Sequence, residues 1–64
     1  MALSRQAAKK ILKEMGAKRV SDSAAESLAQ AINNFAYATA KKAVKLASHA
    51  KRETVKSEDV ELAS

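Results

Sequence analysis

This chain of 64 residues contains no proline, and its single glycine is Gly16. From Ser21 to about Ala50 nothing therefore interrupts a helix. Apolar side chains recur through this segment at helical spacing, as Leu28 and Ile32 do. The pattern predicts one helix of about 28 residues, which at 1.5 Å per residue is about 42 Å long. Such a helix is longer than any globule that a chain of this size can form alone.

A stripe of apolar and small side chains follows one face of this predicted long helix. Its members are Leu28, Ile32, Phe35, Thr39, Ala43 and Leu46, widened by Ala25, Ala29, Ala36, Ala40 and Ala47. A domain of about 60 residues buries only about 60% of its unfolded-chain surface, so it usually relies on disulfides, a metal or a partner chain. With no Cys and one His, His49, the remaining route is association with a second copy.

A short helix is predicted before the long one. It runs from about Ser4, a favourable N-cap, to Met15. Gly16 follows directly, at the place where a residue in the left-handed conformation commonly ends a helix. A short loop of residues 17–20 then leads to the long helix, and good helix formers such as Ala, Lys, Leu and Glu dominate throughout.

The long helix and a final short helix each have a candidate cap. For the long helix the cap is either Ser21, or Ser23 with Glu26 at capping-box spacing. Residues 51–56 are predicted to form a second loop, after which Ser57 caps the last helix. The sequence therefore predicts an all-α chain with a short helix, a long helix and a short helix.

Basic side chains gather in the first helix with its following loop, and again around the end of the long helix. Residues 1–19 hold six basic side chains and one acidic one, whereas residues 20–40 hold two acidic and no basic ones. Residues 41–52 hold five basic side chains and no acidic one. With a formal net charge of +5 and only 3% aromatic residues, this indicates contacts to phosphates rather than base stacking. Double-stranded DNA is the expected partner, although the lysines could also form a solvated surface.

Other classes of function find little support in the sequence. No apolar run approaches the roughly 20 residues needed to cross a bilayer, and the apolar face of the basic first helix is small for membrane binding. We therefore expect a cytoplasmic location on the nucleoid. The chain offers no nucleophile–base pair, no glycine-rich phosphate loop and no cluster of metal ligands. We accordingly expect no enzyme activity, cofactor, metal or small-molecule substrate.

Three segments of the sequence resemble archaeal histones and their bacterial relatives. They are residues 16–21, 43–50 and 52–63. The most specific feature is the Arg-x-Thr-x-x-x-x-Asp spacing of Arg52, Thr54 and Asp59. The resemblance implies that residues 1–64 form a single histone-fold domain, which intertwines head to tail with a second copy as a dimer.

The resemblance also implies roles for individual residues. Arg52 and Asp59 correspond to an intramolecular clamp that braces the second loop against the last helix, a task suited to paired hydrogen bonds. The residues that correspond to DNA contacts or lie beside them are Lys9, Lys10, Lys13, Lys18, Arg19, Thr54 and Lys56. Among these, Arg19 matches an arginine that enters the minor groove, and Thr54 matches a residue that donates to a phosphate. In the dimer these two would act on one phosphate region across the two copies.

A third set of residues corresponds to the contact through which histone dimers join into tetramers or chains. These residues are Leu46, His49 and Asp59, although His49 could also be an exposed histidine favoured by the helix dipole. Glu53 departs from the family pattern, because many members have Lys there beside the phosphate contact. This departure leaves open whether the DNA is wrapped by stacked dimers or bound by discrete tetramers.

The function implied is double-stranded DNA binding and compaction with little sequence preference, by a nucleoid histone that forms homodimers and tetramers or larger assemblies. The alternative is a histone-fold subunit that dimerises within a transcription or replication complex. The two hypotheses differ in whether the chain folds with a second copy of itself or needs a different partner.

Overall fold

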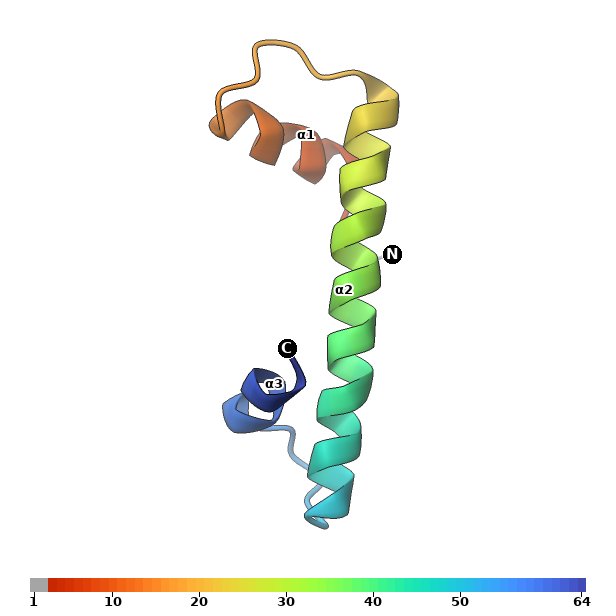
Figure 1. Cartoon of the computed structure of the whole chain (residues 1–64), viewed down its shortest axis with the longest axis vertical. Coiled ribbons are helices and arrows are strands. Elements are labelled where there is room, and N and C mark those ends of the chain that lie inside the picture. Colours follow the sequence, from red (N-terminus) through yellow and green to blue (C-terminus); the bar gives the residue numbers. More distant parts are fainter. Residues whose placement is uncertain (1–2) are drawn as a thin grey trace. The chain divides into compact units, whose positions relative to one another are not determined.

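The computed structural model describes residues 3–64, so Met1 and Ala2, the first residues of the predicted domain, lie outside the described residues. This part of the chain holds three helices and no strand: α1 (Arg5–Glu14), α2 (Asp22–His49) and α3 (Ser57–Ala63), shown in Figure 1. The predicted all-α order of short, long and short helices is confirmed. The chain divides into two compact units, Met1–Asn34 and Phe35–Ser64, and α2 contributes to both.

Both ends of α1 follow from its local sequence. At the start, the Ala7 N–H donates to Ser4 Oγ at 3.1 Å, as expected of a serine cap. At the end, the N–H groups of Gly16 and Ala17 donate to carbonyls of the last helical turn, each at 3.0 Å. Gly16 has a φ of +115°, a conformation that suits glycine because it has no Cβ. The predicted helix end at Gly16 is confirmed.

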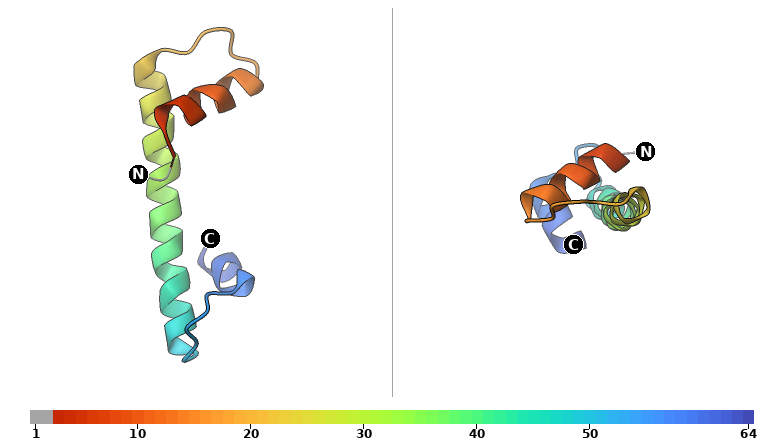
Figure 2. Two further views of the ribbon diagram at one scale, coloured as in Figure 1. Left: turned by 180° about the vertical axis from the view of Figure 1, so that it is seen from behind. Right: turned by 90° about the horizontal axis from the view of Figure 1, so that it is seen from above.

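The first unit is held together by alanines. Its buried core residues are Ala8, Ala25 and Ala29, and Leu3, Val20 and Leu28 pack partly buried against them. Methyl side chains leave room for α1 and α2 to approach closely. Figures 1 and 2 show that α1 begins against α2, whereas its other end stands away from α2, where the loop returns to the start of that helix.

The start of α2 resolves the choice between the two predicted caps. The Ala24 N–H donates to Ser21 Oγ at 3.1 Å, and the Ser23 hydroxyl lies 3.3 Å from that oxygen. Ser21 is therefore the cap, with Asp22 in the first turn, where a negative charge suits the helix dipole.

In the second unit, α3 lies beside the last turns of α2, and the buried residues are Ala43, Ala47 and Asp59. The prediction that Ser57 caps α3 is wrong, because Ser57 is already the first helical residue and Lys56 holds the N-cap position. The Lys56 N–H instead donates to Asp59 Oδ2 at 2.8 Å. The helix start is thus satisfied by a carboxylate inside the first turn, which other contacts hold in place.

Large apolar side chains of the described residues remain exposed while the buried ones are small. The exposed ones are Ile11, Met15, Phe35, Tyr37, Val44, Val55, Val60 and Leu62. Phe35, at the centre of the predicted stripe, is 63% exposed, and Leu62 is 77% exposed. A single chain thus leaves in water much of the surface whose burial drives folding. Within residues 3–64 no helix has the length and apolar character needed to cross a membrane.

Candidate nucleic-acid interface

The loop between α2 and α3 begins with a tight turn. The Lys51 N–H donates to the Ser48 carbonyl at 2.9 Å, and the Arg52 N–H donates to the Ala47 carbonyl at 3.0 Å. Lys51 takes the left-handed conformation with a φ of 59°, which glycine would adopt at less cost. This turn ends α2 and directs Arg52 toward α3.

Arg52 and Asp59 form a paired contact across the second loop. Arg52 Nη1 donates to Asp59 Oδ2 at 2.8 Å, and Nη2 donates to Oδ1 at 2.9 Å. The same Nη1 also donates to the Thr54 carbonyl at 3.1 Å. One guanidinium therefore contacts both the middle of the loop and α3, and two parallel hydrogen bonds fix its plane as well as its position.

The electrostatics of this pair follow from the same contacts. The hydrogen bond from Arg52 and that from the Lys56 N–H lower the pKa of Asp59 from its ordinary value of 3.8 to about 2. The Asp59 hydrogen bond in turn raises the pKa of Arg52 above its ordinary value. Asp59 is only 3% exposed, so this carboxylate is committed to holding the loop.

The surface of the second loop combines groups of opposite character. Glu53, Thr54 and Lys56 are all exposed. Thr54 is tethered through its own carbonyl, which leaves its hydroxyl on the exposed side chain free of that contact. The Glu53 carboxylate comes directly before it in the chain, so a negative charge accompanies the predicted phosphate contact.

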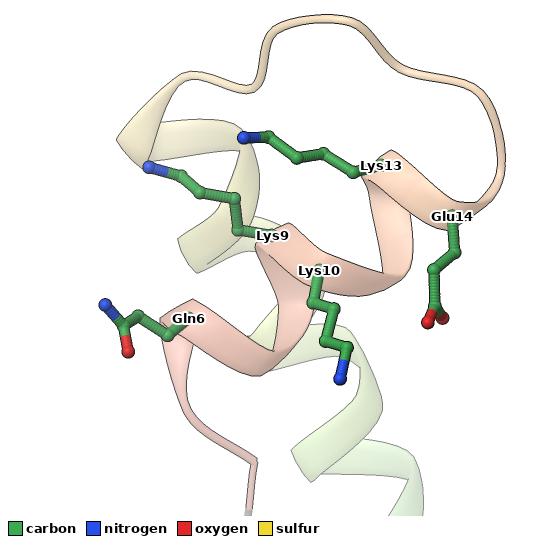
Figure 3. A pocket seen from close by; sticks show the side chains of 5 residues that line it. All are labelled: Gln6, Lys9, Lys10, Lys13 and Glu14. Atoms are coloured by element: carbon green, nitrogen blue, oxygen red, sulfur yellow. The ribbon is translucent and has the colours of Figure 1, made fainter.

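The basic residues predicted on α1 do not all point the same way. Figure 3 shows the side chains of Lys9 and Lys13 extended toward one side, whereas that of Lys10 points in another direction. Lys9 Nζ lies 3.4 Å from Asp22 Oδ1, an ion pair between α1 and the first turn of α2. Lys10 and Lys13 are exposed. Their ammonium groups lack the acidic neighbour that Lys9 has.

The first loop carries two further predicted contacts, Lys18 and Arg19, and both are exposed. They belong to the same compact unit as the lysines of α1, so the structure gathers this basic set in one unit. Thr54, Lys56 and the Arg52–Asp59 pair belong to the other unit. The joint action of Arg19 and Thr54 on one phosphate region stays a prediction.

The residues predicted to join dimers divide into two kinds. Leu46 and His49 line a shallow groove in the second unit together with Lys42, Lys45, Leu62 and Ala63. Asp59 is buried and accepts its hydrogen bonds from Arg52 and Lys56. The predicted pairing of Asp59 with a His49 of another dimer would therefore have to compete with the clamp.

Two polar residues with structural contacts escaped the sequence analysis. Asp22 pairs with Lys9, and Asn33 hydrogen-bonds the main chain of Leu3. The signal for Asp22 was its place in the first turn of a long helix. Asn33 carried a weaker one, a residue of low helix propensity in the middle of a helix, which periodicity alone treats as an ordinary surface position.

The helix order and the clamped loop together define the class of small helical proteins built on the histone fold. Over residues 1–63 the chain matches the family described as histone-like transcription factor (CBF/NF-Y) and archaeal histone. It is 52% identical over 54 residues to a probable archaeal histone 3 of Methanocaldococcus jannaschii, an alignment that covers 84% of this chain and 81% of the relative. It is 46% identical over 54 residues to the archaeal histone HAN1 of Thermococcus zilligii, with 84% and 81% covered. The chain belongs to this histone family, which confirms the resemblance found in the sequence.

Proposed function

We propose that this protein binds double-stranded DNA without sequence preference and compacts it as an architectural histone of the chromosome. The observation that carries the proposal is that a member of the histone family exposes Lys10, Lys13, Lys18 and Arg19 within one unit. Exposed cations of this kind suit the phosphate backbone, whose neutralisation supplies most sequence-independent binding. Histones act as structural proteins rather than enzymes, in agreement with the absence of catalytic motifs in the sequence.

The working form in this proposal is a dimer of two copies, each contributing residues 1–64 as one histone-fold domain. Support comes from the exposed apolar side chains of α2, of which Phe35 is 63% and Val44 is 56% exposed. A second long helix packed on this face would bury them. Leu46 and His49, in the groove of the second unit, then supply the contact for tetramers or larger assemblies.

A second candidate function, dimerisation within a transcription complex, draws on the first part of the family description. Both relatives named above are archaeal histones, which favours the DNA-binding function. Sedimentation of the purified chain separates the two. A folded homodimer supports the histone, whereas a chain that stays unfolded until a different histone-fold protein is added supports the alternative.

DNA binding is tested by gel-shift titration of several unrelated duplexes at low and moderate salt. We expect similar affinities for all duplexes and a linear fall of log affinity with log salt, with a slope of about 0.9 per phosphate neutralised. Binding restricted to one sequence, or binding that salt leaves unchanged, would refute the proposal. A duplex longer than the dimer footprint, digested with nuclease, reports in addition whether the DNA is wrapped or coated.

A further inference from the structure

Asn33 lies within α2 and is buried, with only 4% of its surface exposed. The Leu3 N–H donates to Asn33 Oδ1 at 2.8 Å, and Asn33 Nδ2 donates to the Leu3 carbonyl at 3.0 Å. The two residues are 30 positions apart in the sequence. One side-chain amide thus satisfies both main-chain polar groups of a residue that precedes α1.

These two hydrogen bonds offset the cost of placing an amide in the interior, because buried polar groups are tolerated when they are bonded. The Leu3 side chain also packs against the alanine core formed by Ala8, Ala25 and Ala29. Main chain and side chain of Leu3 are therefore both fixed to α2. The next residue, Ser4, caps α1, so the fixed point lies at the start of that helix.

The other end of α1 has no comparable anchor on α2. It stands away from α2 in both views (Figures 1 and 2), and Met15 at its end is 80% exposed. The direction of a helix held near one end is set by the contacts at that end. In α1 these are the Leu3–Asn33 contact, the burial of Ala8 and the Lys9–Asp22 pair.

We propose that Asn33 is a positioning residue for the basic surface of α1. By holding the main chain of Leu3, its amide fixes where α1 begins on α2. It thereby sets where Lys10 and Lys13 meet a duplex. The part of this inference that concerns DNA rests on the proposed function. The contact with Leu3 does not.

The helix itself gives no reason for an asparagine at this position. Leu and Ala are better helix formers than Asn, and an interior position that required only packing would suit an apolar side chain. Asn33 keeps a polar group that must be satisfied at this depth. The reason for it lies in the segment that it holds.

The test compares wild type with Asn33→Leu, which keeps a side chain of similar shape and removes both hydrogen bonds. Asn33→Asp keeps an acceptor for the Leu3 N–H but removes the donor to the Leu3 carbonyl. Asn34→Leu makes the same replacement at the exposed neighbouring position. Hydrogen exchange of the Leu3 amide is measured by NMR, and affinity for one duplex by gel shift, at a temperature where circular dichroism shows every variant folded.

We expect Asn33→Leu to exchange the Leu3 amide about tenfold faster, as the loss of a buried hydrogen bond predicts. We also expect it to bind DNA about threefold or more weakly, as a loosened support shell implies. Asn33→Asp should lie between this variant and wild type in both measurements, and Asn34→Leu should match wild type.

Either of two results would overturn the inference: a Leu3 amide that exchanges freely in wild type, or a folded Asn33→Leu variant that binds DNA as wild type does. Should Asn33→Leu fail to fold, Asn33→Asp is judged by the same two measurements. A wild-type chain that binds no duplex would refute the proposed function and with it the DNA part of the inference. The exchange rate of Leu3 would then decide separately whether Asn33 holds this segment.

Discussion

Arg52 holds Asp59 through two hydrogen bonds of 2.8 and 2.9 Å, and with the same guanidinium it holds the carbonyl of Thr54 at 3.1 Å. Asp59 in turn accepts from the N–H of Lys56 at 2.8 Å. The second loop is thus closed at three points by one ion pair. The position of Thr54, the predicted phosphate contact, depends on a guanidinium two residues earlier.

Arg52→Lys should destabilise the protein although the charge is kept. An ammonium group cannot reproduce the flat paired geometry of the guanidinium, nor reach the Thr54 carbonyl at the same time. We expect a clearly lower Tm by circular dichroism at fixed protein concentration, together with weaker DNA binding. Lys56→Arg, a charge-conserving exchange on the same loop, serves as the control and should melt like wild type. Equal Tm values for Arg52→Lys and wild type would argue against the clamp.

Acid should weaken the fold through Asp59. Its pKa is lowered to about 2 in the folded chain, whereas an unperturbed aspartate has a pKa of about 3.9. The folded state therefore binds this proton less readily than the unfolded state. The stabilisation is fully present above about pH 4 to 5 and is lost as the pH falls toward about 2.

Asp59→Asn removes this titration and tests its sign. Melting curves from neutral pH to about pH 2 should show the variant less stable than wild type at neutral pH, with the gap closing in acid. Glu61→Gln removes an exposed carboxylate from the same helix and controls for the change in net charge. A gap between Asp59→Asn and wild type that stays constant with pH would contradict the lowered pKa.

Lys51→Gly should stabilise the protein. Lys51 has a φ of 59°, and the left-handed conformation costs a residue with a Cβ about 1 to 2 kcal/mol. Part of this gain is offset by the freedom of glycine in the unfolded chain. We expect urea unfolding at fixed concentration to give a net gain of about 1 kcal/mol. Lys51→Ala removes the same charge and keeps the Cβ, so an equal gain in that variant would point to charge rather than conformation.

Arg19→Ala should weaken binding to every duplex alike. Removal of one phosphate or groove contact is expected to reduce the salt slope by about one. Gel shifts on duplexes of different composition at several salt concentrations measure both quantities. Loss of affinity for some sequences only would show that Arg19 reads bases, contrary to the proposed function.

Glu53→Lys should strengthen DNA binding. The Glu53 carboxylate is exposed beside Thr54 on the second loop, and reversing its charge replaces repulsion of a phosphate by attraction. We expect higher affinity and a salt slope steeper by about one. Glu61→Lys makes the same change in net charge on α3. If both variants gained equally, the effect would reflect net charge and not the position of the second loop.

The helices could be predicted from the sequence because their signals are local. Ser4, Gly16 and Ser21 act on neighbouring main-chain groups, so the ends of α1 and the start of α2 follow from the residues around them. The start of α3 could not be predicted in this way. Its cap depends on Asp59, whose carboxylate Arg52 orients from the end of α2.

The candidate site was accessible from sequence mainly through its resemblance to a family. Composition indicated a basic partner for phosphate, but only the spacing of Arg52, Thr54 and Asp59 selected particular residues of the loop. Contacts across long separations had no such signal. Asn33 meets Leu3 because α1 folds back on α2, and the Lys9–Asp22 pair arises from the same packing. The assignments to DNA contact and to dimer joining stay predictions.

The alanine cores of the two units have a consequence for the cell. Ala8, Ala25 and Ala29 in one unit and Ala43 and Ala47 in the other offer little free energy to a lone chain. Folding that draws its stability from association depends on concentration, and newly made chains below that concentration remain substrates for proteases. The level of synthesis would then decide how much of this protein survives, so that scarce copies are cleared and abundant ones persist.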